Sequence, residues 1–405
     1  MVKNVAAMNI VNNKNTITWE LQSETLKALR FPLVVMVVLI HSFCLKDYDL
    51  PSIESLLNMD INVAIQILLS HVISHIAVPT FYLISGYFFF YKVTHFDVTI
   101  YKGKLRKRVH TLLIPYLLWN ALYFLWVVIL KVGAFLVKGK PLSNIIVFFQ
   151  ENHWLGMFWD CNVWGFDRKS WLGCIPPHTG PILIPLWFLR DLMVVVILTP
   201  FIYYLIKRFK YWIIMLLCAC YITGIWPYIH GFSITAIFFF SLGAYFSIHG
   251  KNMVSELYRY RLISYFLIIP MMLLMWYYDG NNSEIGQYIY PFYIITGVVS
   301  IVCLSTTLTS QGRMNLSKHF SGVTFFIYVS HGLIGFSIAN IILNNIVPMH
   351  DTELIVKIGY YLLLPILTIT ICCLIFVLME RYCPKILDVL TGNRNKLSFY
   401  DRNKK

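Results

Sequence analysis

An arginine and a histidine lie eleven positions apart in the first apolar stretch of the chain, LRFPLVVMVVLIHSFC, as Arg30 and His41. In an α-helix, eleven steps of about 100° return close to the same face, and the rise is about 16 Å. One helix face would then carry a cation at one end and an imidazole at the other. A neutral imidazole accepts a proton near physiological pH, so His41 is a candidate general base whose activity would rise with pH. The alternative is a core histidine bonded to a neighbour.

A second charged pair opens the apolar stretch PLWFLRDLMVVVILTP, which contains Arg190 and Asp191. Ionisable side chains in such a segment are costly to bury and are often functional. We expect Asp191 to orient the imidazole of His41 and Arg190 to stabilise an oxyanion. The same two residues would equally serve as an ion pair that locks two helices together, so both interpretations stand.

Two further apolar stretches, FYLISGYFFF and FIYVSHGLIG, contain Ser85 with Gly86 and Tyr328 with His331. A small Ser-Gly pair permits close helix packing or leaves room for an extended ligand arm. His331 is either a second titrating group or a hydrogen-bonded core histidine.

A run of cations, KLRKRVHTLLIPYLLW, precedes another apolar stretch and includes Arg106, Lys107 and Arg108. Guanidinium groups hold phosphate oxygens bidentately, so this run and Arg30 suit a polyanionic ligand. The alternative is that these residues serve only membrane topology, because cytoplasmic segments accumulate Lys and Arg.

The sequence gives little support for a metal site or for the common hydrolase and nucleotide-binding motifs. His71 and His75 have a four-residue spacing that can bind metal, but no third ligand is evident, so we predict no metal site. No HExxH, P-loop or GxSxG motif occurs. Cys161 and Cys174 form a disulfide or remain free thiols.

The elements that position these residues are membrane helices. Of 405 residues, 58% are hydrophobic and 13% are charged, whereas a soluble domain carries about a quarter charged residues. With about 20 apolar residues per span, the sequence predicts an all-α polytopic bundle of about ten transmembrane helices. They are placed near residues 30–46, 70–91, 111–137, 183–206, 211–227, 231–249, 260–278, 286–309, 323–347 and 354–380, with 61–75 as an interfacial lead-in helix.

The placement of charge predicts that both termini are cytoplasmic, in a cell membrane. Most of the 33 Lys and Arg fall in the segments that this orientation puts inside, while acidic residues favour the outer loops. The net charge of +14 is thereby explained without nucleic acid. The predicted organisation is a cytoplasmic N-terminal segment (1–29) without a signal-peptide core, a membrane domain (30–380) and a basic cytoplasmic tail (381–405).

The longest connection, residues 138–182, is predicted to lie outside and is rich in tryptophan, with Trp154, Trp159, Trp164 and Trp171. Indole rings stack on sugars, but they also anchor proteins at membrane interfaces. The loop is therefore a candidate carbohydrate contact or an interfacial anchor.

Taken together, these motifs resemble the acyltransferase-3 family, integral-membrane enzymes that move acyl groups from coenzyme A thioesters onto hydroxyls of surface or secreted carbohydrates. The matching elements are Arg30 with His41, Ser85-Gly86-Tyr87, the basic run before the third span, the PLWFL string and Tyr328 with His331. The family pattern has two arginines three apart in the basic run. Arg108 matches the first and Thr111 occupies the second, so Arg106, Lys107 or His110 would have to compensate.

The resemblance implies an O-acyltransferase with acyl-CoA, most commonly acetyl-CoA, as donor. Arg30, Lys107, Arg108, Ser85 and Gly86 would bind the donor. His41, Arg190 and Asp191 would be catalytic, and Trp187, Tyr328 and His331 would contact the acceptor. The acceptor is a carbohydrate or another hydroxyl compound, and succinyl or another short acyl group is the alternative to acetyl.

Two other classes are compatible with a polytopic chain. A transporter of a lipid-linked sugar or small solute would be favoured by inverted repeats and paired broken helices, which the sequence does not display. A membrane sensor or scaffold would be favoured by an attached signalling domain. Neither class accounts for the spacing of Arg30 and His41.

Overall fold

The computed structural model describes residues 17–43, 61–137, 154–160, 180–227, 229–278, 284–314, 320–346 and 353–394. In these segments the regular structure is entirely helical, without a strand. The all-α prediction is confirmed for this part of the chain.

The helices before residue 138 are α2 (Trp19–Ala28), α3 (Arg30–His41), α5 (Ile61–Gln66), α6 (Ala77–Phe90), α7 (Val98–Arg108) and α8 (Ile114–Val137). Those that follow are α11 (Trp187–Ile197), α12 (Thr199–Phe209), α13 (Tyr211–Thr223), α14 (Ile234–Ile248), α15 (Met253–Tyr258), α16 (Arg261–Tyr277), α17 (Glu284–Ser310), α18 (Phe320–Ser330), α19 (Phe336–Ile346), α20 (Leu354–Tyr382) and α21 (Pro384–Leu390).

Five of the described helices are long and apolar enough to cross a membrane. They are Ile61–Phe90, Val98–Leu130, Glu284–Ser310, Gly322–Ile346 and Leu354–Tyr382. A bent pair, α11 with α12, makes a sixth if it is one span, and α13, α14 and α16 are shorter apolar helices. The protein is therefore a multi-pass helical membrane protein.

Two predicted spans differ in shape from what the sequence suggested. The stretch 183–206 was expected to be one helix, but it bends by 61° between α11 and α12. Pro200 lies in the first turn of α12, and a proline lacks the N–H that a continuous helix would need there. The stretch 111–137 belongs to a longer rod, because the basic run before it is helical from Val98 onward.

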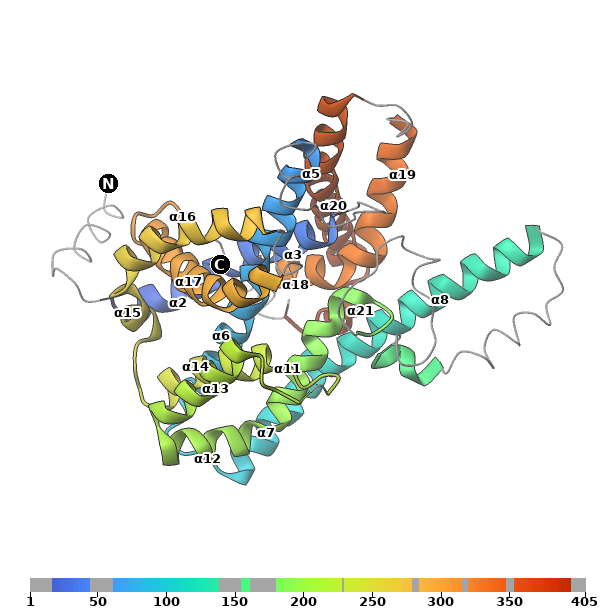
Figure 1. The fold of residues 1–405 in the computed structure, drawn as a ribbon. Helices are drawn as coiled ribbons and strands as arrows, with labels where there is room; N and C mark the ends of the chain where they lie inside the picture. The colour runs from blue at the N-terminus through green and yellow to red at the C-terminus, as the bar shows by residue number, and fades with distance from the viewer. Residues whose placement is uncertain are drawn as a thin grey trace, which may run out of the picture.

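The arrangement in Figure 1 places α7 and α8 in one rod that extends to the right, beyond the other helices. Helices α19 and α20 stand side by side, as do α16 and α17. Helix α2 leads into α3, since Leu29 between them keeps helical dihedral angles.

The N-terminal segment is structured from α2 onward and is held against the bundle. Gln22 of α2 donates to the hydroxyl of Tyr87 at 2.5 Å and accepts from the backbone N–H of Val254 at 3.0 Å. The predicted boundary near residue 30 therefore falls between two helices that pack on the same bundle.

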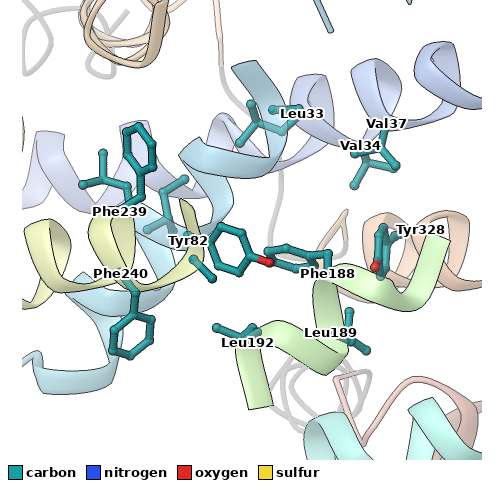
Figure 2. Packing of buried hydrophobic residues seen from close by; sticks show 14 of the residues in the cluster. Leu33, Val34, Val37, Tyr82, Phe188, Leu189, Leu192, Phe239, Phe240 and Tyr328 are labelled. Atoms are coloured by element: carbon teal, nitrogen blue, oxygen red, sulfur yellow. The ribbon is translucent and has the colours of Figure 1, made fainter. Parts of the chain in front are cut away.

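The closest helix crossing joins α6 and α14. A Cβ placed on Gly86 would lie 1.9 Å from the carbonyl oxygen of Phe240, and one on Gly243 would lie 2.0 Å from that of Leu83. Only glycine permits these backbones to approach so closely. Around this crossing lies the buried core, part of which is drawn in Figure 2.

Three described segments have π-helical geometry: η1 (Ile67–Val72), η3 (Val109–Leu113) and η6 (His331–Gly335). Such turns insert an extra residue into a helix and are frequent at functional sites. Each one here contains or adjoins a residue that the sequence analysis singled out, namely His71, Arg108 and His331.

Candidate active site

Helix α3 has Arg30 as its first residue and His41 as its last. Because the helix is continuous between them, the rise from one to the other is about 16 Å. The predicted spacing of the two residues on one helix is confirmed. The arginine end and the histidine end of α3 are described separately below.

Several cations gather at the arginine end of α3. The guanidinium of Arg30 lies 5.3 Å from the ring centroid of Phe88, and that of Arg108 lies 5.9 Å from that of Phe89. Lys104 Nζ donates to the carbonyl oxygen of Phe89 at 2.6 Å. These cations thus gather around the C-terminal turn of α6.

No carboxylate of the described residues pairs with these cations. The described contacts between basic and acidic side chains are Lys27–Glu24, Arg190–Asp191, Arg259–Glu256 and His230–Asp160, the last of which is an ion pair only when the histidine is protonated. Arg30 and Arg108 lie close enough for their positive charges to repel one another. Half-buried cations without an acidic partner have the chemistry to bind an anion.

The residues named as substitutes for an arginine at position 111 face away from this end. Arg106, Lys107 and His110 are exposed, and His110 Nδ1 lies 2.9 Å from the carbonyl oxygen of Arg106 in its own helix. Of the basic run, Lys104 and Arg108 are half-buried.

Two histidines meet at the other end of α3. The ring centroids of His41 and His331 are 5.4 Å apart. His331 is fully buried, its Nδ1 lies 3.1 Å from the carbonyl oxygen of Ile327, and its Nε2 has no hydrogen-bond partner among the described residues. If Nδ1 carries the proton, Nε2 is a free acceptor held in a fixed orientation. The structure thus brings together the two histidines that the sequence placed in distant helices.

The His71 and His75 rings extend this histidine group. Their centroids are 5.8 Å apart, and His71 also contacts Phe43 at 4.1 Å. His75 also lies near His41. Among the described residues, no group of three or more His, Cys, Asp or Glu could hold a metal ion.

Arg190 and Asp191 form a buried ion pair instead of contacting His41. Both are at most 3% exposed, Arg190 Nη2 lies 2.9 Å from Asp191 Oδ1, and Arg190 Nη1 donates to the Trp159 carbonyl oxygen at 2.7 Å. The described hydrogen bonds of Asp191 go to Arg190 and none goes to His41. Because the two residues are neighbours in α11, their ion pair by itself joins no two helices, and it is the bond from Arg190 to Trp159 that links α11 to residues 154–160.

A row of aromatic rings lies between the ion pair and the histidines. Tyr82, Phe188 and Tyr328 follow one another with centroid distances of 4.7 and 6.0 Å, as Figure 2 shows. Tyr328 is 6.4 Å from His331 in the same measure, and its hydroxyl donates to the carbonyl oxygen of Pro185 at 2.5 Å. Trp187, at the start of α11, is half-buried.

Residues 154–160 form the described part of the long connection. Met157 accepts a backbone hydrogen bond from Ile182 at 2.7 Å, and buried Asp160 lies 2.5 Å from His230 Nδ1. Trp159 is 43% exposed and covers Arg190 at 5.5 Å. Trp164, Trp171, Cys161 and Cys174 lie outside the described residues, as does the side chain of Trp154.

Ser85 and Gly86 lie in different environments. Gly86 faces the backbone of Phe240, where even a Cβ does not fit, so the geometry gives it a packing role. Ser85 is half-buried one residue earlier. Of the two interpretations of this element, close packing describes Gly86.

Sequence reasoning missed three residues at the site: Lys104, Tyr82 and Arg394. Lys104 belongs to the basic run, and its position four residues, or about one helical turn, before Arg108 was available as a signal. Tyr82 and Arg394 reach the site through contacts between distant segments, which no local pattern reveals.

The fold and the site thus define a multi-pass helical membrane protein in which half-buried His41 contacts buried His331, while Arg30 and Arg108 have no acidic partner among the described residues. The chain matches the acyltransferase-3 family model, described as an acyltransferase domain, over residues 24–377. It belongs to this family and is an acyltransferase. The succinoglycan biosynthesis protein ExoH of Rhizobium meliloti (strain 1021) is 24% identical to it over 344 residues, which are 82% of this chain and 82% of that protein. No solved structure matches.

Proposed function

We propose that this acyltransferase transfers an acyl group, with acetyl as the first choice, from cytosolic acyl-CoA to a hydroxyl of a cell-surface or lipid-linked carbohydrate. The observation that carries the proposal is helix α3, which joins an unpaired cation group at Arg30 to a histidine pair at His41. Likeness to a protein named for succinoglycan biosynthesis supports a polysaccharide acceptor.

The donor end is assigned from charge. The phosphates of coenzyme A are polyanionic, and Arg30, Lys104 and Arg108 offer cations without acidic partners in the described chain. Lys107 is exposed and would contribute long-range attraction only. An extended pantetheine arm, passing beside Ser85, would carry the thioester toward His41.

At the histidine end, His41 acts as general base. It takes the proton of the acceptor hydroxyl while the hydroxyl oxygen attacks the thioester carbonyl carbon. The carbon–sulfur bond then breaks, and the coenzyme A thiolate leaves with a proton from the protonated histidine. His331, with its unpaired Nε2, holds the acceptor hydroxyl or replaces His41 as base.

The acceptor side comprises the end of the aromatic row and the residues beyond it. Half-buried Trp187 and exposed Trp159 provide ring surface for a sugar, and buried Tyr328 supports them from the row. Arg190 and Asp191 hold this wall in place through their ion pair and the bond to Trp159.

The topology that this proposal requires has about ten spans with both termini in the cytoplasm. Reporter fusions after residue 55 and within 140–180 should read as external, and fusions within 98–104 and at the end of the chain as cytoplasmic. Membranes incubated with labelled acetyl-CoA should transfer label to carbohydrate. A cytoplasmic signal from the 140–180 fusion, or absence of transfer from any acyl-CoA, would overturn the proposal.

The alternative of a transporter has one structural observation in its favour, the 61° bend between α11 and α12. A broken helix lines the substrate site of many transporters. Membership in an acyltransferase family and the histidine pair favour the enzyme.

A further inference from the structure

The segment after α20 returns to the arginine end of α3. Helix α21 is held by Trp119, whose Nε1 donates to the carbonyl oxygen of Leu390 at 3.1 Å. Gly392 follows with a φ of +64°, and a Cβ there would lie 2.7 Å from Thr111 Cα. This close approach brings the C-terminal segment onto η3, directly beside Arg108.

This close approach places Arg394 beside η3. Its Nη1 donates to the carbonyl oxygens of Thr111 at 2.8 Å and Thr391 at 2.7 Å. Its guanidinium carbon lies 3.6 Å from the ring centroid of Phe325. A guanidinium has five N–H donors. The described hydrogen bonds use only those of Nη1, so Nε and Nη2 remain available to a ligand.

The surroundings of Arg394 are positive. Burial, together with the charges of Arg108 and Arg30, lowers the pKa of Arg394 to about 9, so it remains protonated at neutral pH. No carboxylate of the described residues pairs with any of the three. Like charges held together without a counter-ion repel, and a bound polyanion removes that cost.

We propose that Arg394 binds the phosphate groups of the acyl donor, and that Arg30, Arg108 and Arg394 form one arginine cluster for this ligand. The inference rests on the proposed function and adds that the C-terminal segment completes the donor site. The Arg394 guanidinium bonds to the backbone carbonyl of Thr111 itself, whereas Arg106, Lys107 and His110 are exposed to solvent.

The same geometry excludes a purely topological role for this arginine. A residue that only marks the cytoplasmic side needs no fixed partner, as with exposed Arg381 at the end of α20. Arg394 is fixed by two carbonyl groups and a stacked ring. Arg381 therefore serves as a matched control of the same residue type on the same segment.

The test measures the affinity of the purified full-length protein in detergent for coenzyme A, by titration calorimetry. Arg394→Ala should weaken binding about ten- to a hundredfold, the loss of one charge-assisted contact. Arg381→Ala should stay within about twofold of wild type. Elution volume and thermal unfolding confirm that each variant is folded.

Arg394→Lys covers the case in which the alanine variant does not fold. Lysine keeps a charge but lacks the planar fork, so binding should fall by several-fold. Folded Arg394 variants with wild-type affinity, beside a weakened Arg108→Ala, would overturn the inference and leave the proposed function standing. A wild-type protein that binds no coenzyme A would overturn both.

Discussion

Two regions of the molecule treat buried charge in opposite ways. In the charge-pair cluster, Arg190 is joined to Asp191 and His230 to Asp160. In the arginine cluster, Arg30, Arg108 and Arg394 have no acidic partner among the described residues. Since an uncompensated charge is costly to bury, the first arrangement stabilises the fold, and we propose that the second holds its charge for a ligand. On this proposal, the difference separates structural from functional arginines in one chain.

The largest expected effect comes from breaking the charge-pair cluster. Asp191→Ala leaves the Arg190 guanidinium buried without its carboxylate, which should cost about 3–5 kcal/mol of stability. Thermal unfolding in detergent measures this loss. The double variant Arg190→Met with Asp191→Leu removes both charges and should recover most of it. An unchanged unfolding temperature for Asp191→Ala would show that the pair has no structural role.

The corresponding change in the arginine cluster should leave stability intact. Arg108→Ala removes a charge that is already unpaired and repels Arg30, so the unfolding temperature should stay or rise. The binding free energy for acetyl-CoA should become less favourable by about 1.5–3 kcal/mol, which weakens the affinity roughly ten- to a hundredfold. Calorimetric titration measures it. A folded variant with normal affinity would mean that Arg108 serves topology only.

A substitution at Gly86 tests whether this residue belongs to the donor site or only to the packing of α6 on α14. Gly86→Ala forces a Cβ against the backbone of Phe240 and should destabilise the protein by about 1–3 kcal/mol, without changing donor affinity in the folded fraction. Gly103→Ala is the control, since nothing lies within 4 Å of a Cβ there. Lower donor affinity with unchanged thermal stability would instead return Gly86 to the donor site.

The smallest expected effect lies at the rim of the charge-pair cluster. Trp159→Ala should raise the KM for a carbohydrate acceptor by two- to tenfold, because one aromatic contact contributes about 0.5–1.5 kcal/mol. Steady-state kinetics at saturating donor measure it. Trp126→Ala, on α8 and similarly exposed at 41%, should behave as wild type. Equal KM values for both variants would exclude sugar stacking on Trp159.

The sequence predicts what depends on local periodicity. Arg30 and His41 share α3 because helical repeat alone relates them, and the apolar stretches become helices. Pro200 could have predicted the helix break at Leu198, but the continuous apolar run around it suggested a single span. The family resemblance also singled out Arg108 from the basic run, and the structure shows it half-buried.

What the sequence could not predict depends on contacts between distant segments. Arg394 meets Thr111 across 283 positions, and His331 meets His41 only because α3 packs against α18. Asp191 was expected beside His41, but it pairs with Arg190. Because Arg190 is the preceding residue, this pairing requires no ordering of a distant segment, so Arg190 has an advantage over His41 as the partner. Side-chain partners of this kind are decided by packing.

The central claim is that His41 at the end of α3 removes the proton of the acceptor hydroxyl while the arginine cluster holds the donor. The most direct test is acyl transfer per folded molecule of His41→Gln, with labelled acetyl-CoA and a purified carbohydrate acceptor. The account predicts normal folding, normal donor affinity and transfer reduced by roughly 10²–10⁴. A folded His41→Gln enzyme with wild-type turnover would contradict it.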